Sequence, residues 1–268
     1  MNNHPIGIFD SGIGGLTVAN AVKNCLPNEE IIYFGDTAHL PYGEKSSDAI
    51  KSYTLRIIEF LIQKKCKAVV IACNTASATA YEVAQKKLGN QIEIINVIDP
   101  VVEYVSKNYH HKKIGVIGTK RTIASRIYVK KLKKLNPANE VVSMATPLLA
   151  QMIEEGFYNN FISKTIINNY LSKKSFINID AIILGCTHYP LIKNEVSEYF
   201  NHNVDVIDSA EIVAQHLKQY LTDKKLLSNN KTPHHHFIVS DYTESFAKST
   251  KHFFKERIKL EQFHIWNE

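Results

Sequence analysis

Two short apolar segments, each ending in a cysteine, constrain the fold of this chain most strongly. They are residues 69–75, with the sequence VVIACNT, and residues 182–188, with the sequence IILGCTH. Continuous apolar runs of this length are typical of strands that are buried on both faces of a parallel sheet. Each segment therefore predicts a buried strand whose end presents a thiol, Cys73 in the first and Cys186 in the second.

The matched contexts of these two thiols indicate a paired chemical role. Inversion at a carbon atom needs one group to remove a proton and a second group to return a proton on the opposite face. Cys73 and Cys186 are suited to such a role because two parts of the chain deliver them in the same way.

Short apolar strands alternate with amphipathic helices along the whole chain. In the helix predicted from Ser47, apolar residues recur with the helical period, and Ser46 or Ser47 is the expected N-cap. The alternation predicts an α/β protein with mostly parallel sheets. The predicted strands span residues 6–10, 31–35, 68–72, 92–97, 114–118, 140–144, 180–185, 204–207 and 236–240.

A weak internal repeat predicts two similar domains. The strand around Gly7 resembles the strand around Gly115, and a strand ending in cysteine follows each of them further along the chain. We predict two pseudo-symmetric α/β domains, one formed by residues 1–97 with 208–268 and the other by residues 98–207. Ligands of such sheets bind beyond the carboxyl ends of the strands, so we expect an active-site cleft between the domains.

The bulk composition favours a cytoplasmic protein with a small-molecule substrate. Of the 268 residues 44% are hydrophobic, and no apolar run approaches the roughly 20 residues of a membrane span. The N-terminus lacks a secretory pattern, so the cytoplasm is the expected compartment and no membrane partner is expected. The net charge of +6 comes with scattered lysines, as in residues 130–134, and this pattern predicts a solvated face rather than a nucleic-acid partner.

A glycine-rich turn follows the first predicted strand at Asp10. The dinucleotide fingerprint would need a glycine at position 17, where this chain has Thr17. The turn is therefore interpreted as a place where backbone N–H groups and a helix N-terminus receive a small carboxylate, with Ser11 as a further donor.

The surroundings of each cysteine suggest how it is activated. Cys73 precedes a predicted helix, whose dipole should lower the thiol pKa below its ordinary value of about 8.5. Cys186 is followed by Thr187 as a donor and His188 as a proton partner. Two alternatives remain open at this point. One is a zinc site formed by Cys73, Cys186, His188 and a carboxylate, and the other is a hydrolase with one cysteine as nucleophile and His188 as base.

Six segments match the motifs of one enzyme family in the family's order. They are residues 8–17, 35–43, 72–78, 118–122, 153–156 and 185–191. On these residues the chain resembles the glutamate racemases of the aspartate/glutamate racemase superfamily. The resemblance implies cofactor-independent interconversion of L- and D-glutamate, supply of D-glutamate for bacterial peptidoglycan, no metal, and a homodimer. Aspartate racemases share the two-cysteine plan and are the alternative within the superfamily.

The resemblance also implies roles for individual residues, with the two cysteines on opposite faces of the substrate α-carbon. The implied catalytic residues are Cys73 assisted by Asp10, Cys186 assisted by His188, and the further ionisable residues Asp36 and Glu154. The implied substrate contacts are Asp10, Ser11, Pro41, Tyr42, Gly43, Asn74, Thr75, Thr119, Thr122, Thr187 and His188.

Overall fold

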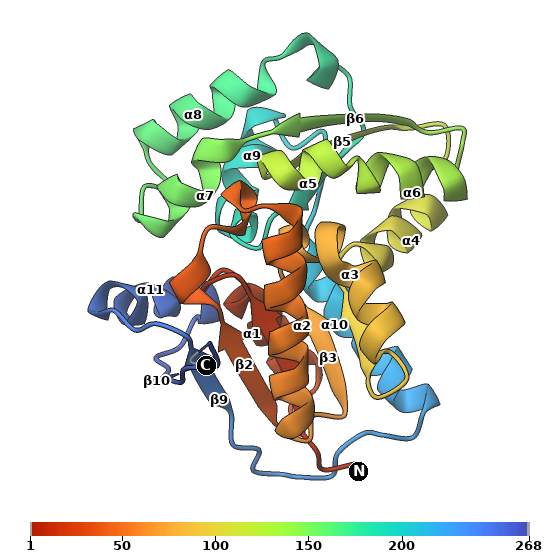
Figure 1. Ribbon diagram of the computed structural model, residues 1–268. Coiled ribbons are helices and arrows are strands. Elements are labelled where there is room, and N and C mark those ends of the chain that lie inside the picture. Colours follow the sequence, from red (N-terminus) through yellow and green to blue (C-terminus); the bar gives the residue numbers. More distant parts are fainter. Residues whose placement is uncertain (1, 267–268) are drawn as a thin grey trace.

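The computed structural model describes residues 2–266 and contains two β-sheets flanked by helices (Figure 1). The larger sheet consists of β1 (Ile6–Asp10), β2 (Ile31–Gly35), β3 (Ala68–Ile71), β4 (Glu93–Asn96), β9 (His236–Val239) and β10 (Leu260–Gln262). The smaller sheet consists of β5 (Lys113–Gly118), β6 (Glu140–Ala145), β7 (Ala181–Gly185) and β8 (Asp205–Ile207). All nine predicted strands are present, and β10 was not predicted.

Every pairing between neighbouring strands is parallel. The strand order is β10-β9-β2-β1-β3-β4 in the larger sheet and β6-β5-β7-β8 in the smaller one. The predicted α/β class is therefore confirmed. The polarity also places the carboxyl ends of all strands of one sheet at the same edge, where ligands of parallel sheets bind.

The connections between strands are mainly helical. The helices are α1 (Leu16–Cys25), α2 (Ser47–Gln63), α3 (Asn74–Leu88), α4 (Asp99–Asn108), α5 (Lys120–Ser125), α6 (Ile127–Leu135), α7 (Pro147–Glu154), α8 (Phe161–Leu171), α9 (Lys193–Tyr199), α10 (Ser209–Asp223) and α11 (Glu244–Phe254). The Ser46 side chain accepts a hydrogen bond from the Ala49 N–H at 3.2 Å, which confirms the predicted N-cap of α2.

The alternation of side chains explains why the central strands have apolar residues at consecutive positions. In β1, Ile6 and Ile8 belong to the hydrophobic core formed with α1, α10 and α11, whereas Phe9 belongs to the core formed with α2 and α3. Successive residues of a strand point to opposite faces, so a sheet covered on both faces needs apolar residues at consecutive positions.

The strands of the larger sheet come from residues 6–96 and 236–262, and those of the smaller sheet come from residues 113–207. The predicted domain boundaries, after residues 97 and 207, fall between these groups, and the division into domains itself stays a prediction. Among the residues that the structure describes, no helix has both the length and the apolar character needed to cross a membrane.

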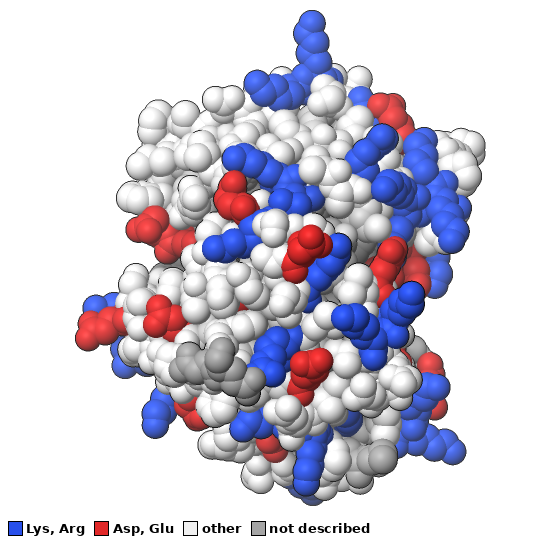
Figure 2. Space-filling model, viewed as in Figure 1, with Lys and Arg blue, Asp and Glu red and all other residues white. Residues whose placement is uncertain are grey.

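Charged side chains of both signs are interspersed over the face shown in Figure 2, with a gathering of lysine and arginine over the region of α6. In α6, Lys130, Lys133 and Lys134 are exposed, whereas Tyr128 and Leu132 are buried. This helix therefore presents a lysine-rich side to solvent, as its sequence pattern predicts.

Candidate active site

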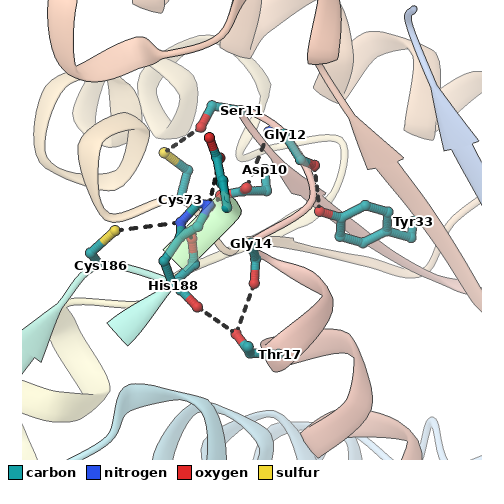
Figure 3. A network of polar contacts seen from close by, with 11 residues as sticks. Asp10, Ser11, Gly12, Gly14, Thr17, Tyr33, Cys73, Cys186 and His188 are labelled. Carbon is teal, nitrogen blue, oxygen red and sulfur yellow. Dashed lines mark hydrogen bonds and ion pairs between the residues drawn. The ribbon is translucent and has the colours of Figure 1, made fainter. Parts of the chain in front are cut away.

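The carboxyl ends of β1, β3 and β7 bring four of the predicted catalytic residues, Asp10, Cys73, Cys186 and His188, into one buried network (Figure 3). Asp10 is fully buried, and Cys73 and Cys186 are 5% and 6% exposed. The hydroxyl of Thr187, which follows β7 of the smaller sheet, donates to Asp10 Oδ1 of the larger sheet at 3.4 Å. The site is therefore assembled from both sheets.

Cys73 occupies the N-cap position of α3. Its Sγ accepts a hydrogen bond from the Ala76 N–H at 3.4 Å and lies 3.6 Å from the Ser11 hydroxyl. Burial and the negative charge of Asp10 outweigh these contacts and raise the pKa of the Cys73 thiol to about 12. The prediction of a lowered pKa was therefore wrong, because the helix N-terminus acts as expected but desolvation is the larger effect.

Asp10 ends β1 beneath the glycine-rich turn. Its Oδ2 accepts a hydrogen bond from the Gly12 N–H at 3.1 Å, and the carbonyl of Gly12 accepts one from the Tyr33 hydroxyl at 2.7 Å. Burial raises the pKa of Asp10, although His188 and the backbone N–H groups of the turn oppose this shift. A carboxyl group with a raised pKa beside a buried thiol is able to exchange a proton with it.

Cys186 has a different partner. Its Sγ lies 3.6 Å from His188 Nδ1, and His188 Nε2 lies 2.7 Å from Oε1 of Glu154 at the end of α7. Burial alone would lower the pKa of His188, but the contacts with Cys186 and Glu154 prevail and raise this pKa well above its usual value. His188 therefore holds a proton more firmly than a free imidazole does, and its ring joins the Cys186 sulfur on one side to Glu154 on the other.

Asp36 holds a loop in place instead of contacting either sulfur. This buried carboxylate accepts hydrogen bonds from the Tyr42 hydroxyl at 2.6 Å and the Ser240 hydroxyl at 2.9 Å, and His39 Nδ1 lies 2.9 Å from it. Burial and the Asp36 charge raise the pKa of Tyr42 well above its usual value, so the phenol keeps its proton. Pro41, a predicted substrate contact, is exposed and precedes the 3₁₀ helix that Tyr42 begins.

The predicted substrate-binding hydroxyls lie where the two sheets meet. Thr75 Oγ1 lies 2.9 Å from Thr119 Oγ1, which in turn donates to Thr122 Oγ1 at 3.0 Å. Gly43 lies against Thr119, because a Cβ at Gly43 would stand 3.3 Å from the Thr119 Cβ. The structure therefore brings Thr75, in the helix that follows β3 of the larger sheet, next to Thr119 and Thr122, which follow β5 of the smaller sheet.

Asn74 presents an unused donor in this region. Its Oδ1 accepts a hydrogen bond from the Tyr128 hydroxyl at 2.7 Å, which fixes the orientation of the amide. Its Nδ2 is buried and has no hydrogen-bond partner within residues 2–266. A buried donor without a partner is costly, so it is suited to a ligand that supplies an acceptor.

Four residues of this network were not predicted from the sequence as parts of the site. They are Thr17 and Tyr33, which hold the glycine-rich turn, Ser240, which contacts Asp36, and Phe253, whose ring meets the His188 ring edge-on at 5.3 Å. Thr17 was noted only as the residue that breaks the dinucleotide fingerprint. Ser240 and Phe253 come from the C-terminal part of the chain, and only its return to the larger sheet brings them here.

The zinc alternative gains no support from the geometry. Within residues 2–266, His, Cys, Asp and Glu side chains form no group of three or more that is arranged to hold a metal ion. Of the three consecutive histidines, His236 begins β9 and the other two precede that strand.

The protein is of the α/β class, and each of its two parallel sheets presents a buried thiol with its own ionisable partner. This arrangement is suited to acid–base chemistry. Residues 16–217 match the family model described as Asp/Glu/Hydantoin racemase. A glutamate racemase from Geobacter metallireducens is 41% identical over 91% of this chain and 90% of its own length.

Solved structures agree with this match. A glutamate racemase from Francisella tularensis in complex with D-glutamate superposes with a TM-score of 0.93 at 40% identity, covering 99% of both chains. A glutamate racemase isoform from Bacillus anthracis superposes with a TM-score of 0.91 at 36% identity, covering 98% of both chains. An aspartate racemase homologue from Pyrococcus horikoshii, at 22% identity and a TM-score of 0.57, shares the fold alone.

The chain therefore belongs to the Asp/Glu/Hydantoin racemase family of amino-acid isomerases, and within it to the glutamate racemases. The resemblance based on the six sequence segments is confirmed.

Proposed function

We propose that this chain interconverts L- and D-glutamate by a two-base mechanism with Cys73 and Cys186 as the proton-transferring groups. The observation that carries the proposal is the pair of buried thiols from opposite sheets, one beside Asp10 and the other beside His188. The identity of 41% to a glutamate racemase over most of the chain supports glutamate as the substrate.

The charge states around the two sulfurs suggest their starting roles. With its pKa raised to about 12, Cys73 is a neutral thiol near neutral pH and is poised to donate a proton. His188 Nδ1 lies 3.6 Å from Cys186 Sγ, so this ring is placed to exchange a proton with that sulfur when Cys186 acts as the base. In one direction Cys186 breaks the Cα–H bond by taking the proton, and Cys73 gives its proton to the opposite face of the same carbon.

The reverse direction exchanges the two roles. Cys73 then acts as the thiolate and Cys186 as the thiol, so each sulfur needs a partner that can store or release a proton. Asp10 is placed to serve Cys73, and His188 with Glu154 is placed to serve Cys186. A racemase has products of equal energy in water, so two matched thiols suit both directions.

The intermediate carbanion has to be stabilised by the site. Asn74 Nδ2, which has no hydrogen-bond partner in the described part of the chain, and the hydroxyls of Thr75 and Thr119 form a set of donors for the substrate carboxylate. Fixed donors in a site that excludes water stabilise developing negative charge more strongly than solvent does. We propose that Tyr42, held by Asp36, closes this side of the site.

The proposal includes a biological role and an assembly. D-glutamate made by this enzyme would enter bacterial peptidoglycan synthesis, as the family resemblance implies. A homodimer is likewise a proposal, and sedimentation analysis of the purified protein tests it.

Incubation of the purified protein with L-glutamate, followed by chiral separation, tests the proposed function. D-glutamate should accumulate until the two enantiomers are equal. Conversion of L-aspartate in a parallel reaction, without conversion of glutamate, would refute the substrate assignment, and conversion of neither would refute the racemase proposal.

The Cys186–His188–Glu154 chain of contacts also resembles the nucleophile, base and orienting acid of a hydrolase. That function would leave Cys73 without a role. It predicts a covalent acyl adduct on Cys186, which mass spectrometry after incubation with an activated ester would detect.

A further inference from the structure

Thr17 lies in the first turn of α1, and its buried hydroxyl contacts backbone carbonyls from both halves of the site (Figure 3). Its Oγ1 lies 2.9 Å from the Gly14 carbonyl oxygen and 3.0 Å from the Thr187 carbonyl oxygen. The Gly14 carbonyl also accepts a hydrogen bond from the Thr17 backbone N–H at 3.1 Å. The single hydroxyl proton of Thr17 is therefore shared between the Gly14 and Thr187 carbonyl oxygens, and the Gly14 carbonyl has the backbone N–H of Thr17 as a second donor.

This arrangement differs from the usual one for a threonine in a helix. Such hydroxyls commonly donate to a carbonyl one turn earlier in the same helix. Thr250 in α11 shows the usual case, because its buried hydroxyl donates to the Ala247 carbonyl at 2.8 Å. Thr17 has an additional acceptor that lies in the other sheet's half of the site, directly after Cys186.

The bond to Thr187 acts on the peptide that joins the two reactive residues of that half. Thr187 lies between Cys186 and His188, so fixing its carbonyl limits the rotation of the backbone that carries both side chains. The other side of the same turn is held by Asp10, which accepts a hydrogen bond from the Thr187 hydroxyl at 3.4 Å. Gly14 also packs closely against this turn, because a Cβ at its position would stand only 2.4 Å from the His188 ring.

We propose that Thr17 is a positioning residue for racemisation, which holds the turn of Cys186 and His188 at the separation from Cys73 that proton transfer across one carbon requires. This inference rests on the proposed two-cysteine function. Thr17 does not transfer a proton itself and acts through the Thr187 backbone. Displacement of reacting groups by about 1 Å can slow a reaction roughly 100-fold, so one bond at this place has a large effect on rate.

Three variants test the proposal through their kinetics. Thr17→Val removes the hydroxyl with little change in shape, Thr17→Ser keeps it, and Thr250→Val removes a buried helical hydroxyl that does not join the two halves. We expect Thr17→Val to lower kcat by at least about tenfold, the effect of losing one hydrogen bond, with KM close to that of the wild type. Thr17→Ser should restore most of kcat, and Thr250→Val should leave it unchanged.

The proposal is overturned if Thr17→Val loses no more activity than Thr250→Val, or if Thr17→Ser loses as much as Thr17→Val. Thermal unfolding of each variant shows whether a loss of activity reflects a loss of folded protein.

A measurement that does not depend on turnover separates this inference from the proposed function. The rate at which iodoacetamide alkylates Cys186 reports how firmly its turn is held, and Cys66, buried outside the site, is the internal reference. The ratio of the Cys186 rate to the Cys66 rate should rise in Thr17→Val and stay constant in Thr250→Val. An unchanged ratio in Thr17→Val refutes the positioning role, whereas a wild type that does not racemise glutamate refutes the proposed function.

Discussion

Replacing Gly14 by alanine perturbs the point where the two halves of the site touch. A Cβ at this position would stand 2.4 Å from His188 Cε1, 2.5 Å from His188 Nδ1 and 2.6 Å from Thr187 Oγ1. These distances are about 1 Å shorter than ordinary contact. The neighbours are a ring and a hydroxyl that both belong to the site, so relief of the clash must displace His188.

The size of the effect follows from that displacement. A misplacement of about 1 Å costs roughly 100-fold in rate, so kcat for racemisation should fall by about two orders of magnitude. Gly12→Ala in the same turn is the matched control, because a Cβ there would meet only Leu40, at 3.7 Å. Neither glycine has a positive φ, so backbone conformation does not distinguish the two variants.

Initial rates of D-glutamate formation, measured by chiral separation at saturating L-glutamate, give kcat for both variants. Circular dichroism establishes that each is folded. Equal activity of Gly14→Ala and Gly12→Ala would refute the reasoning, because it would mean that the His188 ring can move without consequence.

Three further predictions follow from buried groups. Cys73→Ala and Cys186→Ala should each abolish racemisation in the chiral assay, and substantial turnover by either variant would contradict the two-base scheme. Asp10→Asn should slow turnover yet raise the thermal unfolding midpoint at pH 7. Burial raises the pKa of Asp10 in the folded state, so ionisation of this group costs stability as the pH rises above its pKa in the unfolded chain, about 3.9. The stability advantage of the variant should therefore disappear below about pH 4. Glu29→Gln should lower the free energy of unfolding in urea by about 3 kcal/mol, because the buried Nζ of Lys67, now 2.6 Å from Glu29, would keep its two backbone carbonyl partners but lose its acidic one. Adding Lys67→Met should recover most of the loss.

The strands whose bounds could be predicted from the sequence are buried along their whole length. β1 and β2 have the predicted bounds because each is mainly apolar and buried at every position, covered on both faces of the sheet. β10 escaped prediction because only Leu260 of its three residues is buried, so the segment has no apolar pattern. A strand with a single core position leaves no periodic signal, and its place in the sheet is set by the rest of the fold.

The site could be predicted only where function and strand ends coincide. Cys73 and Cys186 stand at strand ends, and the motif match supplied Glu154, which the structure places beside His188. The error in the Cys73 pKa arose because a helix N-terminus is visible in a sequence, whereas complete desolvation is visible only in the folded protein. The support of Asp36 by Ser240 could not be predicted either, because it depends on β9 pairing with β2.

The most direct test of the two-base account is the isotopic composition of both enantiomers early in a reaction of L-glutamate in D₂O. The account predicts that the D-glutamate formed carries one deuterium at the α-carbon while the remaining L-glutamate is still largely unlabelled, because one sulfur removes the original proton and the other delivers a proton from solvent. D-glutamate that retains the original proton, or L-glutamate that gains deuterium as fast as D-glutamate forms, would contradict the assignment of separate proton-transfer roles to Cys73 and Cys186.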